Sequence, residues 1–303
     1  MKKVINFMGI RHVAFAVTVV LTLISLGSLA IKGLNFGLDF TGGTLIELSY
    51  QKPADQQQVK AQLAQAGFAD AVVQSFGATT DLLVRMPGDD PLLGNQVADA
   101  LLKADSANPA TVKRVEFVGP AVGEELRDQG GLGMLLALGG ILLYVAFRFQ
   151  WKFGFGAIVS LIHDVIVTLG VFSFFEIPFD LTVLAAVLAI IGYSLNDTIV
   201  VFDRIRENFR VLRKTELIDN INISTTQTLL RTMATSISTL LAIVALMVFG
   251  GEPLWGFSLA LFIGVSAGTY SSVYIASILL IWLKLTTEDL IPPVASEEVD
   301  ERP

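Results

Sequence analysis

The chain has 303 residues, of which 53% are hydrophobic and 16% charged, and its formal net charge at pH 7 is −7. Soluble domains carry about 25% charged residues, so this composition is typical of a membrane protein. The acidic balance argues against nucleic acid as a partner. The absence of cysteine excludes disulfides, thiolate metal sites and thiol nucleophiles, and we expect no bound metal.

Six apolar runs are long enough to cross a bilayer, which takes about 20 apolar residues. They cover residues 13–31, 130–147, 153–175, 181–202 and 232–250, and a last span within 254–283. The first run could be a signal peptide, because Ser28-Leu29-Ala30 resembles a cleavage site. Its 19 uncharged residues exceed the 7–15 of a signal peptide's apolar region, so we expect a span that is not cleaved.

The basic residues predict the orientation of the spans. Lys and Arg lie before span one, in the loops after spans two and four, and after span six, whereas the loops at 176–180 and 251–253 have none. Because basic loops stay in the cytoplasm, both termini are expected there. The predicted parts are a cytoplasmic N-terminus with span one (1–32), an outward domain (33–129), spans two to four (130–203), a cytoplasmic amphipathic segment (204–230), spans five and six (231–284) and an acidic cytoplasmic tail (285–303).

The amphipathic segment is predicted to contain one helix, over residues 203–225, lying along the membrane. In the outward domain, segments with the period of a strand alternate with segments with the period of a helix. Strands are predicted at 44–50, 71–76, 81–86 and 112–118, and helices at 53–66 and 92–103. The order βαββαβ is that of a ferredoxin-like domain.

Five glycines lie where this domain joins the membrane spans: Gly37, Gly42, Gly43, Gly119 and Gly123. Glycine adopts backbone angles that other residues avoid. These positions therefore predict tight turns or hinges between domain and spans, with direct contact to a substrate as the alternative. No sequence of the form GxxxxGK[ST] is present, so the cluster is not a nucleotide-binding loop.

Two carboxylates interrupt the apolar runs. Asp164 lies near the middle of span three, with Ser160 and Thr168 on the same helical face, and Asp197 lies in the cytoplasmic half of span four. A carboxylate at such depth costs roughly 2.5–3.5 kcal/mol, and such groups usually face a bundle interior or a water path. They predict a proton- or ion-coupled machine.

The neighbours of these carboxylates allow more than one reading. His163 could relay a proton or simply bond a neighbouring helix. Arg231 on span five could extend to the membrane surface, or could reach Asp197 and favour its ionised form. Asn196, Thr198 and Thr235 are auxiliary candidates for the same pathway.

Small residues predict where spans four and six pack. Gly192 lies on span four, and Gly264 and Gly268 form a GxxxG on span six. Small residues let the backbones of two helices approach closely. We expect these three glycines to face one another.

Several motifs resemble those of the SecD/SecF family of export proteins, which are relatives of the RND transporters. They are GLDFTGG at 37–43, GPAVGEEL at 119–126, SLIHDVIVTLG at 160–170, IIGYSLNDTIVVFDRIREN at 190–208, LLRTMATS at 229–236 and GTYSSVYIAS at 268–277. The resemblance covers nearly all of residues 36–283.

The resemblance implies an α-helical inner-membrane subunit of six spans, an RND-like half with a ferredoxin-like periplasmic domain between helices one and two. Such a subunit pairs with SecD, contacts lipid, and works beside the SecYEG channel and its associated subunits. It uses the proton motive force to draw unfolded preproteins outward. The family's aspartate in NDT and arginine in RT are proton-pathway residues and correspond to Asp197 and Arg231. Protons are the coupling ion, and no other cofactor is expected.

Two other functions fit the same sequence. One is an RND-like, proton-coupled exporter of a lipid or small hydrophobic molecule, which would favour a large apolar pocket in the outward domain. The other is a purely structural scaffold, in which Asp197 and Arg231 would tolerate neutral replacement. Enzyme activity is not expected, because the sequence has no catalytic triad, metal set or phosphate loop.

Overall fold

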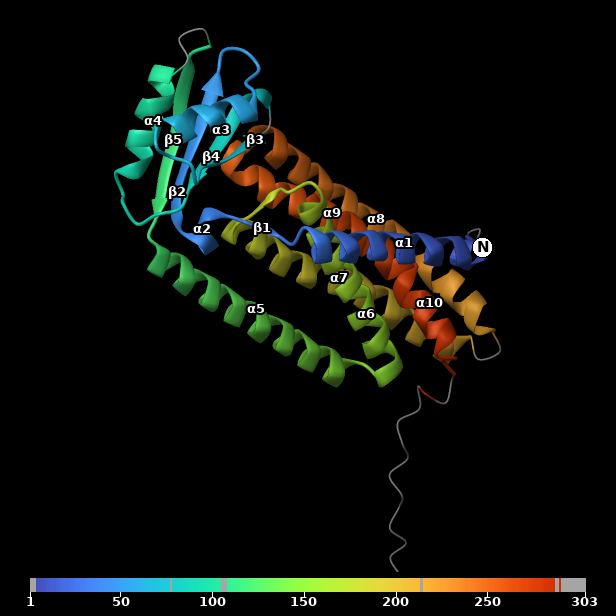
Figure 1. The fold of residues 1–303 in the computed structure, drawn as a ribbon. Helices are drawn as coiled ribbons and strands as arrows, with labels where there is room; N and C mark the ends of the chain where they lie inside the picture. The colour runs from blue at the N-terminus through green and yellow to red at the C-terminus, as the bar shows by residue number, and fades with distance from the viewer. Residues whose placement is uncertain (1–3, 77, 105–107, 213–214, 287–288, 290–303) are drawn as a thin grey trace, which may run out of the picture. The chain divides into compact units, whose positions relative to one another are not determined.

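The computed structural model describes residues 4–76, 78–104, 108–212, 215–286 and 289. Within these residues, six helical segments are long and apolar enough to cross a membrane, as predicted (Figure 1). They are α1 (Arg11–Ile31), α5 (Pro120–Arg148), α6 (Trp151–Phe174), α7 (Leu181–Val211), α8 (Leu217–Phe249), and α9 (Trp255–Val273) with α10 (Ile275–Trp282).

The chain divides into two compact units. The helical bundle comprises Met1–Asn35, Leu136–Ile177 and Thr182–Pro303, and the sheet domain comprises Phe36–Leu135 and Pro178–Leu181. The last residues before α7, from Pro178 on, thus belong to the sheet domain, although the segment from the end of α6 to Ile177 belongs to the bundle. Helices α5 and α7 each run from one unit into the other.

The sheet domain has the predicted ferredoxin-like order. Its elements are β2 (Gly43–Tyr50), α3 (Gln56–Gln65), β3 (Val72–Phe76), β4 (Ala78–Met86), α4 (Leu93–Ala104) and β5 (Ala110–Val118). The strands form an antiparallel sheet in the order β3-β4-β2-β5. The central strand β2 is therefore the first in sequence, and β3 and β5 form the edges.

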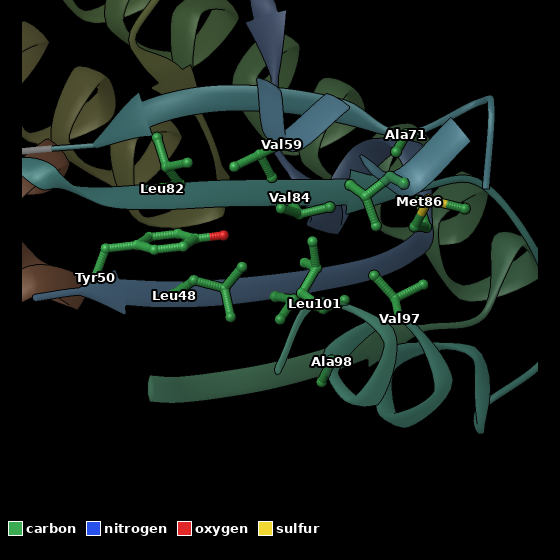
Figure 2. Packing of buried hydrophobic residues seen from close by; sticks show 12 residues of the cluster. Leu48, Tyr50, Val59, Ala71, Leu82, Val84, Met86, Val97, Ala98 and Leu101 are labelled. Atoms are coloured by element: carbon green, nitrogen blue, oxygen red, sulfur yellow. The ribbon is translucent and has the colours of Figure 1, made fainter. Parts of the chain in front are cut away.

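A single apolar core joins this sheet to its two helices (Figure 2). Alternate residues of β2 and β4, such as Leu48 and Val84, point to one face, and Leu63 of α3 and Leu101 of α4 pack against them. Burying a side chain of this kind fully contributes about 1.5–3 kcal/mol. The period-two pattern of the strands therefore determines which face the helices cover.

Two helices differ in extent from the prediction. Helix α5 begins at Pro120, ten residues before the predicted span at 130, because proline suits the first position of a helix. The separate amphipathic helix predicted over 203–225 does not form. Helix α7 continues to Val211 and α8 begins at Leu217, since no glycine or proline between 193 and 249 interrupts either helix.

Three short elements were not predicted. Strands β1 (Asn35–Phe36) and β6 (Pro178–Phe179) pair, and α2 covers Leu38–Thr41. They are too short to give a periodic signal in the sequence. β1 lies just before the GLDFTGG segment, α2 lies within it, and β6 lies in the loop before α7.

Candidate functional site

Asp164 is fully buried on α6 and accepts hydrogen bonds from two other helices. Ser194 Oγ of α7 donates to its Oδ2 at 2.6 Å, and Ser271 Oγ of α9 donates to the same oxygen at 2.7 Å. His163 Nδ1 lies 3.1 Å from the other oxygen, Oδ1. The side chain of Asp164 therefore links three spans.

The polar seam predicted on α6 is buried throughout. Ser160, Asp164 and Thr168 have no exposed surface, and Thr168 Oγ1 donates to the backbone carbonyl of Asp164 at 2.8 Å. His163 is 5% exposed, and within the described residues its Nε2 has no hydrogen-bond partner. The imidazole thus has one nitrogen facing Asp164 and one nitrogen open to a further partner or proton.

Asp197 on α7 has a different environment. It is 3% exposed, and Ser236 Oγ of α8 donates a long hydrogen bond of 3.5 Å to its Oδ2. A distance of 3.5 Å is at the limit for a hydrogen bond. In the described residues, Asp164 therefore accepts two short hydrogen bonds from serine side chains, whereas Asp197 accepts one long hydrogen bond.

The sequence left open whether Arg231 reaches Asp197 or extends to the membrane surface, and in the described residues the two form no direct ion pair. Among the described residues, no basic side chain lies within ion-pair distance of Asp197, and Arg231 is exposed on α8. Ser236, which does contact Asp197, is five residues further along α8, about 140° round the helix. Arg231 therefore projects from a different face.

Three hydroxyls of α9 each contact a different helix. Thr269 Oγ1 lies 2.8 Å from Ser236 Oγ of α8, Ser271 bonds Asp164 of α6, and Ser272 Oγ lies 2.9 Å from Thr198 Oγ1 of α7. The sequence analysis gave no role to Ser194, Thr269, Ser271 and Ser272. The available signal was three hydroxyls within four residues, which point in different directions around one helix.

The remaining auxiliary candidates lie at the edge of this arrangement. Thr198 is buried, whereas Asn196 is exposed. Thr235 is exposed, and its Oγ1 donates to the backbone carbonyls of Arg231 and Thr232 in its own helix. The structure brings Thr198 into the hydroxyl network and leaves Asn196 and Thr235 outside it.

The glycines of α9 pack against α7, but not against Gly192. A Cβ on Gly264 would lie 2.3 Å from Ile190 Cδ1, and one on Gly268 would lie 3.0 Å from Ser194 Cβ. Gly192 is exposed, with nothing within 4 Å of its Cβ position. The expectation that Gly192 faces the other two was wrong, because a small residue permits close approach without requiring it.

The predicted junction glycines lie in crowded surroundings. Gly42 and Gly43 have φ of 65° and 104°, which favour glycine. A Cβ on Gly42 would lie 2.8 Å from Pro120 Cα, and one on Gly123 would lie 2.9 Å from Gly42 N. The start of α5 thus crosses the GLDFTGG segment at close range, while Gly119 has open space around its Cβ position. Whether any of these positions acts as a hinge stays a prediction.

No metal site accompanies this network: in the ranges that the structure describes, no group of three or more acidic or histidine side chains is placed to hold an ion. A six-span bundle with buried, hydroxyl-bonded carboxylates and a ferredoxin-like domain between spans one and two defines a multi-pass membrane protein of transporter-like architecture.

Comparison with known proteins narrows this class. The family model "Protein export membrane protein SecD/SecF, C-terminal" matches residues 97–286, and "SecD/SecF GG Motif" matches 27–54. "Protein translocase subunit SecF" of Pseudomonas aeruginosa is 72% identical over 99% of this chain and 98% of its own length. SecF of Vibrio alginolyticus is 48% identical over 100% and 98%, and SecF of Escherichia coli O157:H7 is 44% identical over 100% and 95%.

The solved structures agree. The crystal structure of SecDF from Thermus thermophilus, described as a translocon-associated membrane protein, is 40% identical with a TM-score of 0.83, over 93% of this chain and 39% of that longer chain. SecDF in a super-membrane-facing form, also 40% identical, has a TM-score of 0.68 over 94% and 39%. The chain belongs to the SecD/SecF family, and within it to the SecF subunits, and it therefore has a role in protein export.

Proposed function

We propose that this protein is an accessory subunit of the Sec translocase that uses the proton motive force to promote preprotein export. It forms a complex with SecD, lies in the inner membrane with both termini in the cytoplasm, and works beside SecYEG. Protons are its coupling ion. The observation that supports this most directly is the buried carboxyl group of Asp197, for which the described part of the chain supplies one long hydrogen bond, from Ser236.

The contrast between the two carboxylates assigns them different parts. Asp164 accepts two short hydrogen bonds from Ser194 and Ser271, so a change in its charge would disturb three spans together. Protonation of Asp197 would disturb only the long hydrogen bond that it accepts from Ser236 in the described residues. We therefore assign the exchangeable proton to Asp197 and a supporting position to Asp164, with the α9 hydroxyls connecting their surroundings.

The exposed face of α8 supports a helical partner such as SecD. Arg231, Thr235 and Ser238 are exposed on this membrane-spanning helix, beside apolar side chains such as Leu241, which is 67% exposed. Arginine facing hydrocarbon is costly, whereas Leu241 suits either lipid or protein. A partner helix that pairs the guanidinium would remove this cost. The SecDF neighbour, of which this chain covers 39%, carries additional chain in which such a partner can lie.

The test is export into inverted membrane vesicles with and without a proton gradient. Asp197→Asn should insert and co-purify with SecD normally, while its export with a gradient should fall to the level without one. Asp70→Asn, an exposed acidic residue of the sheet domain, is the matched control and should export like the wild type. Gradient-stimulated export by Asp197→Asn at the wild-type level would refute the proposed function.

A further inference from the structure

The GLDFTGG segment holds the first turn of α7. The backbone N–H of Leu181, the first residue of α7, donates to Asp39 Oδ2 at 3.0 Å. Two residues earlier in each segment, the N–H of Gly37 donates to the Phe179 carbonyl at 2.7 Å. A side-chain oxygen that satisfies a free N–H at a helix start is a helix cap. Here the capping carboxylate comes from 142 residues earlier in the chain.

Close packing reinforces these two hydrogen bonds. A Cβ on Gly37 would lie 2.9 Å from Asp180 Cβ and 3.2 Å from the Phe179 carbonyl oxygen, so only glycine fits without a shift. The ring of Phe40 stacks on Phe179 at 5.9 Å between centroids, and Phe36 meets both rings edge-on. Aromatic pairs in such geometry contribute about 0.5–1.5 kcal/mol beyond their buried area.

The central strand β4 of the sheet also contacts the residues beside this helix cap. Arg85 of β4 donates from Nη1 to the Phe36 carbonyl at 2.9 Å. Burial lowers the pKa of Arg85, and the nearby negative charge of Asp180 opposes that shift. One guanidinium thus lies near both Phe36, which immediately precedes the GLDFTGG segment, and Asp180, the residue before α7. The sheet, the segment and the helix start therefore form one connected body within the sheet domain.

Helix α7 continues from this body into the bundle. Asp197 lies 16 residues after Leu181 on the same helix, about 24 Å along its axis. No proline interrupts the helix over this distance. One helix thus joins Asp197 to the turn that Asp39 caps.

We propose that Asp39 is a positioning residue: it fastens the first turn of α7 to the GLDFTGG segment, so that the sheet domain moves with the helix that carries Asp197. This inference rests on the proposed function and names the contact through which the proton site acts on the domain. We call the contacts of Gly37 and Asp39 with residues 179–181 the clamp. Bending between domain and bundle then takes place at other residues.

Substitution at Asp39 provides the first test, in vesicles that contain the full complex. Asp39→Ala should lower gradient-stimulated export about fivefold, the population change that corresponds to the loss of one helix cap, and leave gradient-independent export unchanged. Asp39→Asn keeps an acceptor oxygen and should export nearly like the wild type. Asp55→Ala is the matched control, because Asp55 caps α3 of the same domain through the Gln57 N–H at 2.9 Å.

A cross-link provides the second test and does not depend on Asp39→Ala folding. The chain has no cysteine, so a Gly37→Cys/Asp180→Cys pair can be read without background. The 2.9 Å between Cβ positions must open by roughly half an ångström or more to reach the 3.5–4.5 Å of a disulfide. The oxidised protein should export with a gradient as well as its reduced form, and oxidation should restore export to the same pair carrying Asp39→Ala.

Three results would overturn the inference. They are equal export by Asp39→Ala and Asp55→Ala, a loss with Asp39→Asn as large as with Asp39→Ala, and an oxidised pair that is inactive until it is reduced. Each is distinct from failure of the proposed function, which is measured by Asp197→Asn alone. If Asp197→Asn abolishes gradient-stimulated export and Asp39→Ala leaves it unchanged, the proposed function is supported and the proposed role of Asp39 is refuted.

Discussion

Ser271 Oγ of α9 lies 2.7 Å from Asp164 Oδ2 of α6 and donates a hydrogen bond to it. Both side chains have no exposed surface, so water cannot replace either partner. The same carboxylate oxygen accepts from Ser194 of α7. The centre of the bundle is therefore held by one acceptor oxygen of Asp164 that links three helices.

Ser271→Ala should destabilise the bundle by about 1 kcal/mol, because it leaves Asp164 with one short hydrogen bond fewer. Thermal unfolding of the purified protein in detergent measures the change. Ser266→Ala is the matched control on the same helix, since Ser266 is exposed and donates to the Phe262 carbonyl of its own helix. Equal stability of the two variants would show that the Asp164 bond contributes nothing.

Gly264→Leu should destabilise the bundle by about 1–3 kcal/mol through overpacking, because a Cβ there would lie 2.3 Å from Ile190 Cδ1. Gly192→Leu makes the same change on the facing helix at a position with open space and should be tolerated. Unfolding in detergent distinguishes them. Equal sensitivity at both positions would contradict the packing of α9 on α7 through Gly264.

Arg231→Ala should change the stability of the isolated chain by less than about 0.5 kcal/mol, because Arg231 is exposed and forms no ion pair with Asp197 in the described structure. Its effect should appear only in the presence of SecD, as weaker co-purification. Leu230→Ala, on the adjacent exposed position at 77% exposure, serves as the control. A destabilised isolated chain would place the partner of Arg231 within this chain.

The sheet domain should lose part of its stability in acid through Asp81. A hydrogen bond from Ser49 lowers the pKa of Asp81 below its ordinary 3.8, burial partly opposes this, and Lys113 lowers it further. A carboxyl whose pKa is depressed by folding stabilises the fold above its unfolded pKa, and this contribution disappears as the pH falls through the folded value. Asp81→Asn should therefore be less stable at pH 7, by about 1 kcal/mol or less, and the difference should shrink below about pH 4.

Urea unfolding of the full-length protein, followed by a fluorophore on Lys60→Cys of α3, measures this difference at pH 7 and pH 3. Asp70→Asn should show no such dependence. A gap between wild type and Asp81→Asn that persists at pH 3 would mean that the charge of Asp81 is not its cause.

The sequence predicted the parts of this protein whose signals are long and periodic. Six apolar runs and the βαββαβ alternation are read directly from spacing, and the carboxylates of Asp164 and Asp197 stand out because charge in hydrocarbon is rare. The partners of those carboxylates were not predictable in the same way. Spacing gives the face of a helix on which Ser271 lies, but not which neighbouring helix that face meets, and so Arg231 seemed a better partner for Asp197 than Ser236.

The clamp at Asp39 was hidden for a related reason. Its two sides are 142 residues apart, and β1, α2 and β6 are each four residues or shorter. The glycines of GLDFTGG are conspicuous in the sequence, but a glycine is expected both where the backbone must bend and where a neighbouring chain packs closely. Only the atoms around the Gly37 Cβ position distinguish the two.

The position of β5 at an edge of the sheet has a consequence for a protein with a role in protein export. An open edge strand offers unpaired backbone groups to any extended segment nearby, and charged side chains on the edge discourage such pairing. Lys113, Arg114 and Glu116 stand along β5 with side chains that are 42%, 40% and 36% exposed. An extended polypeptide that approached this edge would have to bury those charges, so β5 is protected against pairing with a further strand.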